Sequence, residues 1–237
     1  MLRVLLSVPL AVVCTVALGL PSIAVGLVDH GGRFARRAAG AWGRILLVTW
    51  GVRVVVSGRE NVPAGPAVYA ANHGSALDIP ILFGHLPVDF RIIHKRSLHY
   101  IPVLGAYLWL GGHIGIDRES AFHARRSLER AADRIRQGTS VAVFPEGTRS
   151  GDATVRTFKR GTFVLAVTAG VPIVPVSLAG VKRIAPRGML RMRPGTVRLT
   201  IHPAVTTAGR DARDAAVLAE EVRGVVARAC ALEDGAA

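Results

Sequence analysis

The segment Asn72–Asp78, which reads NHGSALD, places a histidine and an aspartate five positions apart. A neutral imidazole can accept a proton from a hydroxyl group, and a carboxylate on its other nitrogen fixes the tautomer and stabilises the imidazolium. His73 is therefore the candidate general base, and Asp78 is its candidate orienting carboxylate. Taken alone the pattern is weak, because His, Ser and Asp are ordinary loop residues.

The spacing of this pair restricts the local structure. In a regular helix, residues five apart point about 140° from each other, so His73 and Asp78 cannot both face one site if the whole motif is helical. We expect His73 on the loop that follows a strand at Ala67–Ala71. The next helix is then expected to begin between Ser75 and Ile79, so that the aspartate reaches back to the imidazole.

Ser75 offers a rival mechanism, in which it acts as a covalent nucleophile beside His73. The nucleophile elbow GxSxG is absent, because His73 and Leu77 occupy its glycine positions. A metal site is also not expected, since no second His or carboxylate forms a recognisable ligand set with His73.

A second segment, Phe144–Ser150, reads FPEGTRS and also follows a predicted strand. Gly147 permits close approach of the backbone to a bound anion. Arg149 can grip a phosphate with its planar guanidinium, and the hydroxyl groups of Thr148 and Ser150 can donate hydrogen bonds. The two segments together, in this order and about seventy residues apart, are far more specific than either one.

The composition favours a lipid partner over nucleic acid. The 237 residues include 30 Lys and Arg against 16 Asp and Glu, a formal charge of +14, which predicts attraction to polyanions. Hydrophobic residues make up 50% of the chain and aromatic residues only 5%, which leaves little for base stacking. We therefore expect an anionic membrane surface as a partner and no nucleic acid.

The N-terminal 50 residues predict a membrane-associated helical hairpin. Val4–Val28 carries no charge, and as one helix of about 37 Å it would be long enough to cross a bilayer, although Pro9 and Pro21 interrupt it. After a predicted turn at Asp29–Gly32, arginines and apolar residues alternate with the spacing of an interfacial helix. A cleaved signal peptide and a buried core helix pair are the alternatives. The hairpin is expected either to dip into one leaflet or to span the bilayer once. If it spans, the excess of positive charge after the segment predicts that the following domain lies on the cytoplasmic side.

Beyond this hairpin, residues 51–237 predict one α/β domain with a largely parallel or mixed sheet. The expected strands are Val52–Val56, Ala67–Ala71, Phe90–Ile93, Ser140–Phe144, Ile173–Leu178 and Val197–Ile201. The expected helices are Ile79–Gly84, Ser120–Arg136, Gly161–Ala169 and Asp211–Ala231. The basic stretch Lys182–Arg198 predicts a loop or hairpin that is either a solvated charged face or a contact for anionic headgroups or an acidic carrier protein.

Four ordered blocks resemble those of the 1-acylglycerol-3-phosphate acyltransferases, a family of glycerophospholipid acyltransferases. The resemblance runs from about Val52 to Val205. The blocks are Asn72–Asp78, Gly112–Arg118, Phe144–Ser150 and Val171–Ser177. It implies a single glycerolipid-acyltransferase-like domain whose sheet is flanked by helices. In the second block the family commonly has a bulky residue where Gly115 stands, which changes the pocket shape and removes no catalytic group.

The resemblance also implies roles for individual residues. His73 would be the base and Asp78 its partner. The glycerophosphate site would be shaped by Arg118, Glu146, Gly147, Thr148 and Arg149. Pro175 would belong to the wall of the acyl or acceptor site, and Lys95 would bind phosphate or steady the oxyanion unless it is only an exposed basic residue.

The function implied by the resemblance is transfer of a fatty acyl group to the sn-2 hydroxyl of 1-acylglycerol 3-phosphate, giving phosphatidic acid in phospholipid biosynthesis. The donor would be acyl-CoA or acyl-carrier protein, with no metal or redox cofactor, and the enzyme would work at the cytoplasmic face of the cell membrane. One alternative is the same chemistry on glycerol 3-phosphate or a lyso-aminolipid. Another is an inactive membrane-binding scaffold, which the intact His73 and Asp78 argue against.

Overall fold

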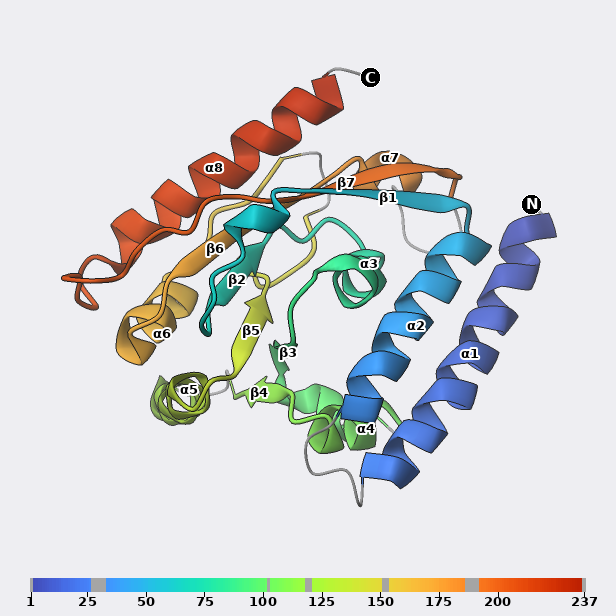
Figure 1. Ribbon diagram of the computed structural model, residues 1–237, viewed down its shortest axis with the longest axis horizontal. Helices are drawn as coiled ribbons and strands as arrows, with labels where there is room; N and C mark the ends of the chain where they lie inside the picture. The colour runs from blue at the N-terminus through green and yellow to red at the C-terminus, as the bar shows by residue number, and fades with distance from the viewer. Residues whose placement is uncertain are drawn as a thin grey trace.

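A computed structural model describes residues 2–26, 33–101, 103–117, 121–150, 154–185 and 192–235 of the chain. Within these ranges a central β-sheet lies between two layers of helices (Figure 1). This α/β architecture with a mixed sheet confirms the fold class expected from the sequence.

Seven strands of the described part form one sheet in the order β1-β7-β6-β2-β5-β3-β4. The strands are β1 (Val52–Ser57), β2 (Val68–Ala71), β3 (Phe90–Lys95), β4 (Ile114–Ile116), β5 (Ser140–Val143), β6 (Ile173–Ala179) and β7 (Gly195–Ile201). The five from β6 to β4 run parallel to one another. β7 is antiparallel to β6 and parallel to β1. The carboxyl ends of β6, β2, β5, β3 and β4 therefore meet at one edge of the sheet.

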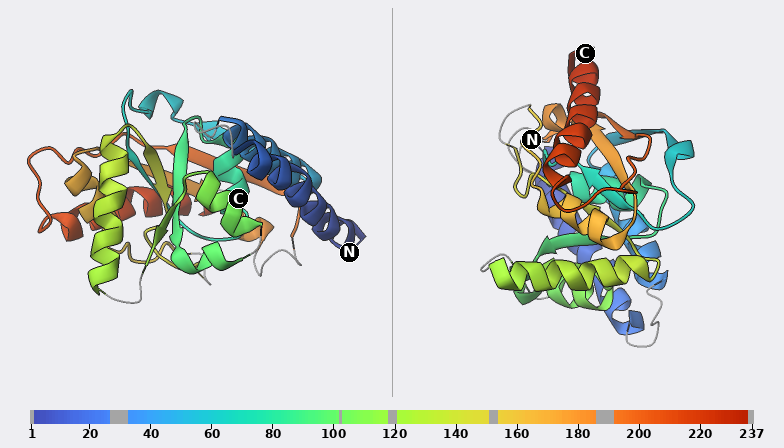
Figure 2. Two further views of the ribbon diagram at one scale, coloured as in Figure 1. Left: turned by 90° about the horizontal axis from the view of Figure 1, so that it is seen from below. Right: turned by 90° about the vertical axis from the view of Figure 1, so that its left-hand side faces the viewer.

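Helices cover both faces of this sheet (Figures 1 and 2). On one side lie α1 (Leu2–Gly26), α2 (Arg33–Thr49) and α3 (Asp78–His85), and on the other α5 (Ala121–Arg136), α6 (Gly161–Ala169) and α8 (Ala215–Gly235). The shorter helices are η1 (Arg59–Asn61), η2 (Arg96–Tyr100), α4 (Leu104–Leu110) and α7 (Val181–Ile184). Because both faces are covered, the central strands β2, β5 and β6 are buried along their whole length.

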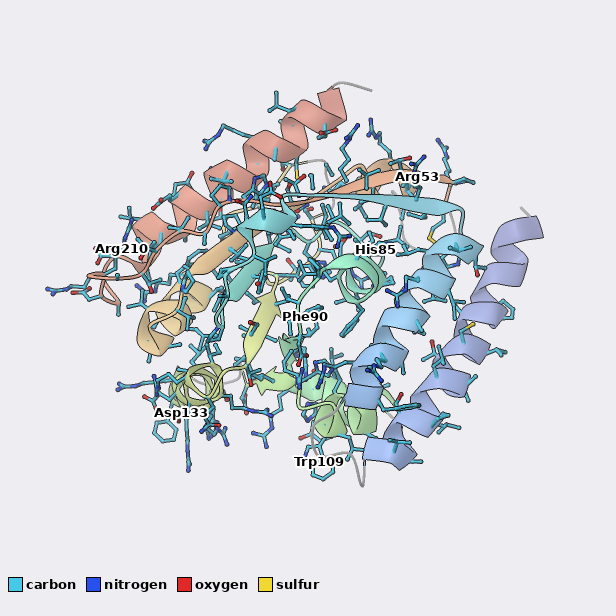
Figure 3. The ribbon with its side chains drawn as sticks, viewed as in Figure 1. Arg53, His85, Phe90, Trp109, Asp133 and Arg210 are labelled. Atoms are coloured by element: carbon cyan, nitrogen blue, oxygen red, sulfur yellow. The ribbon has the colours of Figure 1, made fainter. Side chains whose placement is uncertain are left out.

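Apolar side chains fill the space between the sheet and each helical layer. Phe90 on β3 stacks on Phe83 of α3 with their ring centroids 5.3 Å apart, and it points into the interior in Figure 3. Trp109 on α4, in contrast, projects away from the protein body (Figure 3) and is exposed. The packed interior thus holds α3, the helix that begins with Asp78, firmly against the strands that lead to the histidine loop.

The N-terminal helices pack on the domain through α2. A Cβ built on Gly43 of α2 would lie only 2.5 Å from the carbonyl oxygen of Pro80 in α3, so this close crossing requires glycine. α1 lies on the outer side of α2 (Figure 1), and the indole Nε1 of Trp42 donates to the hydroxyl of Thr15 at 3.0 Å. The two helices are therefore continuous with the packing of the α/β domain.

α1 differs from the expected interrupted segment. It is a single helix that contains both Pro9 and Pro21, and it lies alongside α2, whose packing supports it where the prolines remove backbone hydrogen bonds. Among the described residues, none of the helices combines the length and the apolar character needed to span a membrane. The predicted turn Asp29–Gly32 lies outside the described residues.

The six expected strands are present with shifts of a few residues at their ends, but the short strand β4 and the helix α4 were not expected. α8 begins at Ala215 instead of Asp211, because the Asp214 carboxylate accepts the Asp211 N–H at 2.9 Å and holds the preceding residues in a turn. The expected loop or hairpin at Lys182–Arg198 is also partly wrong. Lys182 belongs to α7, and β7 begins at Gly195.

Candidate active site

The predicted site residues of the parallel strands gather at their common carboxyl edge. His73 lies two positions after the end of β2, Lys95 ends β3, and Glu146 follows β5 by three positions. In open α/β sheets this edge is where substrates bind. Arg118 follows β4 in sequence but lies outside the described residues, so its role remains a prediction.

The histidine loop begins with an asparagine that extends the sheet. The Asn72 side-chain amide donates to the Leu178 carbonyl at 3.1 Å, and its oxygen accepts the Leu178 N–H at 2.8 Å. The Asn72 side chain thus makes the pair of hydrogen bonds that a strand backbone would make. These two hydrogen bonds connect the end of β2 to β6. The next residue, His73, therefore starts from a fixed position.

The backbone of His73 is held by the second motif. Its N–H donates to Oε1 of Glu146 at 2.8 Å. Its carbonyl accepts the Ser150 N–H at 2.9 Å and the Ser150 hydroxyl at 3.3 Å. The FPEGTRS segment thus binds both polar groups of the His73 backbone, which explains why the two motifs occur together.

The imidazole of His73 is bound by Asp78 as the spacing predicts. Nδ1 of His73 lies 2.7 Å from Oδ2 of Asp78, and the same oxygen accepts the Ser75 N–H at 2.9 Å. α3 begins at Asp78, within the expected interval, and His73 lies on the preceding loop. A carboxylate acceptor requires the proton on Nδ1 and so leaves the lone pair of Nε2 to accept a proton from substrate.

Burial sets the electrostatics of this pair. The Asp78 side chain is fully buried (0% exposed), whereas 16% of the His73 side chain is exposed. Burial raises the pKa of the Asp78 carboxyl, and the hydrogen bond from His73 works against this rise. The His73 ring stacks on Phe144 with a centroid separation of 4.1 Å. An accessible base therefore rests on a buried carboxylate and an aromatic ring that restrict its orientation.

Glu146 faces inward and is 4% exposed. Besides the His73 N–H, it accepts the Arg156 N–H on Oε2 at 3.4 Å. Burial raises the pKa of Glu146, and the hydrogen bonds and the charges of His73 and Lys182 oppose that rise. These hydrogen bonds of Glu146 are with the protein itself, while Thr148 and Arg149 are exposed beside the loop and available to a ligand.

Gly147 makes the turn between the inward carboxylate and these exposed side chains. Its φ of +74° lies in the left-handed region, and an added Cβ would lie 2.9 Å from Nζ of Lys159. We predict that Gly147→Ala destabilises the fold by about 1–2 kcal/mol and lowers activity by moving Arg149. Urea unfolding and acylation rates would measure the two effects.

The matched control is Gly170→Ala, because Gly170 has a φ of +69° but no neighbour within 4 Å of an added Cβ. It shares the backbone strain and lies at the end of α6, away from the His73 loop. Equal losses of activity in the two variants would contradict a special role for the Gly147 turn.

The remaining predicted residues occupy different environments. Lys95 is exposed at the end of β3, where its side chain is available to an anionic group. Pro175 is buried in β6 beside Ala70 of β2, while its neighbours Val174 and Val176 belong to the core beneath α2 and α3. By strand alternation Pro175 faces the opposite layer. Its role as a wall of the site stays a prediction.

Ser75, the rival nucleophile, is 4% exposed. Its hydroxyl oxygen accepts the Leu77 N–H at 3.3 Å, and its backbone N–H binds Asp78. These bonds give Ser75 a structural place in the turn that leads into α3. In the described part of the chain, no group of three or more His, Cys, Asp and Glu side chains is arranged to hold a metal ion.

Two residues of the site were missed by sequence reasoning. Asn72 has no predicted role beyond opening its motif, and Lys182 has none beyond its place in a basic stretch. Nζ of Lys182 is buried and the aliphatic part of its side chain lies against Gly74 of the His73 loop, so its ammonium is not a surface contact for headgroups. Its position three residues after the buried strand β6 is the signal that could have placed it at the carboxyl edge of the sheet.

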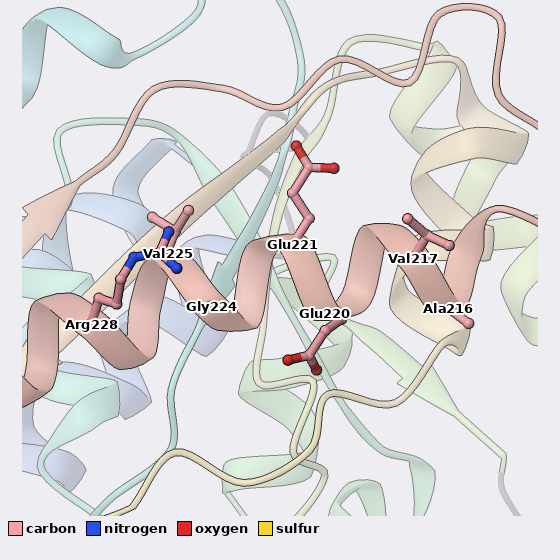
Figure 4. A pocket seen from close by; sticks show the side chains of 7 residues that line it. All are labelled: Ala216, Val217, Glu220, Glu221, Gly224, Val225 and Arg228. Atoms are coloured by element: carbon pink, nitrogen blue, oxygen red, sulfur yellow. The ribbon is translucent and has the colours of Figure 1, made fainter.

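A separate concavity runs along α8 (Figure 4). It is lined by Ala216, Val217, Glu220, Glu221, Gly224, Val225 and Arg228. Its carboxylates are engaged, because Glu220 forms an ion pair with Arg223 and Glu221 with Arg210. The groove contains none of the predicted site residues, so the candidate active site remains the edge around His73.

Comparison with known proteins identifies the family of the chain. Residues 53–179, more than half of the chain, match the family model described as Acyltransferase. The chain belongs to the acyltransferase family. All four sequence blocks, from Asn72–Asp78 to Val171–Ser177, lie inside the matched range.

Several acyltransferase relatives are named for one activity. A 1-acyl-sn-glycerol-3-phosphate acyltransferase of Chlamydomonas reinhardtii is 41% identical over 65% of this chain and 47% of its own length. A chloroplastic one of Arabidopsis thaliana is 33% identical over 82% and 54%, and the human alpha form is 36% identical over 73% and 62%. The chain thus spans about half to three fifths of these relatives.

A solved structure covers nearly the whole chain. The crystal structure of the 1-acyl-sn-glycerophosphate acyltransferase PlsC from Thermotoga maritima matches with a TM-score of 0.82 and 30% sequence identity. The match covers 97% of this chain and 93% of that one. It therefore includes both the N-terminal helices and the α/β domain, and this acyltransferase shares the fold of PlsC throughout.

Proposed function

We propose that the protein transfers a fatty acyl group to the sn-2 hydroxyl of 1-acylglycerol 3-phosphate and produces phosphatidic acid. The observation that carries this proposal is the 2.7 Å contact between Nδ1 of His73 and the buried Asp78 carboxylate, which leaves Nε2 as the base. The activity for which the relatives are named supports the choice of acceptor.

The proposed chemistry is a direct transfer. The acceptor hydroxyl oxygen attacks the thioester carbonyl carbon while its proton passes to Nε2 of His73. The C–S bond then breaks, and the leaving thiolate takes the proton from the imidazolium. Asp78 stabilises the imidazolium between these two steps. The donor is a thioester of coenzyme A or of acyl-carrier protein, and no metal or redox cofactor takes part.

The acceptor phosphate is assigned to the exposed side of the FPEGTRS loop. Arg149 and Thr148 are exposed there, and each charge-assisted hydrogen bond to a phosphate oxygen contributes about 1.5–3 kcal/mol. Lys95 supplies a further positive charge from the end of β3. Arg118 completes the proposed set, as the second block implies, with Gly147 as the turn that positions Arg149.

The acceptor is tested by competition. The purified enzyme would be offered equal amounts of 1-acylglycerol 3-phosphate, glycerol 3-phosphate and a lyso-aminolipid with one labelled donor. We expect phosphatidic acid to be the main product, and Arg149→Ala to lose rate chiefly on the phosphate-bearing acceptors. Preferential acylation of the lyso-aminolipid would overturn the proposed acceptor while leaving the acyl-transfer chemistry in place.

We also propose that the N-terminal helices hold the enzyme on an anionic lipid surface, at the cytoplasmic face of the cell membrane. α1 carries the exposed apolar side chains Val12, Val13, Val16 and Leu20, and α2 carries exposed Arg37 and Arg44. Apolar burial with basic charge is the combination by which interfacial helices bind anionic membranes.

Replacing two of the exposed valines of α1 tests this contact. Val12→Asp combined with Val16→Asp is expected to weaken binding to vesicles that contain anionic lipid by roughly tenfold or more. Burial of each valine side chain in the lipid contributes about 1.5 kcal/mol or more to the free energy of binding. Co-sedimentation measures the change, and Val217→Asp on the exposed face of α8 is the control. Unchanged binding of the double variant would rule out α1 as the contact.

A further inference from the structure

Lys182 occupies an unusual position for a lysine. It lies in α7, directly after the buried strand β6, and its ammonium nitrogen has essentially no exposed surface. A lysine is rarely buried unless its charge is compensated. The groups around this ammonium therefore indicate what it does.

The side chain of Lys182 passes beneath the catalytic loop. A Cβ built on Gly74, the residue after His73, would lie 3.5 Å from both Cγ and Cε of Lys182. The aliphatic part of the lysine thus packs against the backbone of the loop. A Cβ at position 74 would be in ordinary van der Waals contact with the lysine, so the loop and this side chain lie directly against each other.

Lys182 and Glu146 line the same small cavity. Its other polar walls come from Asn72, Ser150 and Thr154. The volume of about 10 Å³ is close to the space of a single water molecule. Lys182 and Glu146 therefore face the same cavity. Among the influences that lower the pKa of the buried Glu146 carboxyl, the charge of Lys182 acts after the two backbone hydrogen bonds and the charge of His73.

Glu146 is the link from this cavity to the base. Its Oε1 accepts the His73 N–H at 2.8 Å, and a carboxylate accepts such a bond more strongly than a neutral carboxylic acid does. The charges that act on Glu146 are those of Lys182 from α7 and His73 from the loop before α3, and the Arg156 backbone N–H binds its second oxygen.

We propose that Lys182 is a positioning residue, whose buried ammonium keeps Glu146 a carboxylate and thereby holds the His73 loop in place. The kinetic consequence rests on the proposed acyl transfer, but the structural consequence is measurable without any substrate. Lys182 does not touch the reacting atoms in this proposal. It acts through Glu146 and the backbone of His73.

The sign of the pH effect follows from the charges. Burial raises the pKa of Glu146 and Lys182 lowers it, so removing the lysine raises that pKa further. As the pH falls, Glu146 then becomes protonated at a higher pH in Lys182→Met than in the unaltered protein. The loop should therefore loosen earlier on acidification when the ammonium is absent.

Amide hydrogen exchange in peptides that cover residues 72–78 tests the structural part. At matched pH, we expect Lys182→Met to lose protection of this loop at a higher pH than the unaltered protein, and Lys182→Arg, which keeps the charge, to retain most of the protection. In a Glu146→Gln background, Lys182→Met should produce a smaller shift, since the amide does not titrate. Arg228→Met, which removes a cation from the outer groove of α8 (Figure 4), is the control.

The kinetic part uses the same variants. We expect Lys182→Met to lower kcat on the order of 10- to 100-fold, with a steeper loss at acidic pH, and Lys182→Arg to recover part of it. The proposal would be overturned if Lys182→Met and the unaltered protein exchanged residues 72–78 equally fast at every pH. It would also be overturned if Lys182→Met shifted the pH at which protection is lost by the same amount with Glu146 and with the amide. If exchange changed as expected but the protein acylated no acceptor, the proposed function would be wrong, while the positioning of the His73 loop by Lys182 would still be supported.

If Lys182→Met does not fold, Lys182→Arg and Glu146→Gln still decide the matter. Glu146→Gln should make protection of residues 72–78 less sensitive to pH than it is in the unaltered protein. A loop whose pH dependence is the same with Glu146 or with the amide would show that the carboxylate does not control it, and Lys182 would then have no route to His73.

Discussion

His73→Ala is expected to lower the rate of acyl transfer on the order of 10²- to 10⁴-fold, the usual contribution of a positioned histidine base. The variant removes Nε2, the only nitrogen of this ring that is not bound to Asp78. The backbone bonds of His73 to Glu146 and Ser150 do not involve the ring, so they remain. The effect should therefore appear in kcat with little change in KM, measured in mixed micelles of detergent and lysolipid.

The control for this substitution is His123→Ala on α5, because His123 is exposed on the opposite side of the sheet. Thermal unfolding of both variants must stay close to that of the unaltered protein. A folded His73→Ala variant that keeps more than about a tenth of the rate would show that another group accepts the proton.

Asp78→Asn is expected to produce the second large loss, again on the order of 10²- to 10⁴-fold in kcat. The amide has nearly the same size, and its oxygen can still accept the Ser75 N–H, so the turn into α3 should form. What disappears is the negative charge 2.7 Å from the His73 imidazole. The imidazolium that forms during transfer then lacks its buried counter-charge, and the amide can also select the wrong tautomer.

A double variant separates this explanation from a general loss of structure. If Asp78 acts only through the imidazole, His73→Ala combined with Asp78→Asn should be no slower than His73→Ala alone. Multiplicative losses would mean that Asp78 has an independent function. Asp89→Asn, which alters an exposed carboxylate just before the amino end of β3, is the matched control and should leave the rate unchanged.

The sequence predicted the parts of this fold that depend on local pattern. The runs that begin at Ser140 and Ile173 form strands because buried parallel strands are apolar on both faces. The β-branched run at Val52 forms the edge strand β1, in which only Val52 is buried. The angle between His73 and Asp78 in a helix predicted the loop before α3, and the 2.7 Å contact agrees with it. These inferences needed only the spacing of neighbouring residues.

Other features depend on residues that meet only in the folded chain. The three-residue strand β4 is too short to show a period, and it is recognisable only by its pairing with β3. Nothing near Asn72 in sequence indicates that its side chain binds Leu178, 106 positions away. In the sequence Lys182 is one of several cations in a basic stretch. Only the fold, in which α7 follows β6, shows that its side chain lies against Gly74.

Glu146 illustrates the same limit within a motif. From the motif alone, Glu146, Thr148 and Arg149 were expected to shape one site for the acceptor phosphate. In the structure only Thr148 and Arg149 are exposed. The left-handed backbone of Gly147 turns the chain between Glu146 and these two residues, and the glutamate points inward to the His73 N–H. The motif therefore combines a structural brace with two side chains available to substrate.

The measurement that tests the central claim most directly is formation of labelled phosphatidic acid by the purified enzyme from labelled 1-acylglycerol 3-phosphate. Acyl-CoA and acyl-carrier protein would be offered separately, with His73→Ala measured alongside. We predict phosphatidic acid with at least one donor and a product level near background for the variant. The absence of phosphatidic acid with both donors, or its undiminished formation by His73→Ala, would contradict the account.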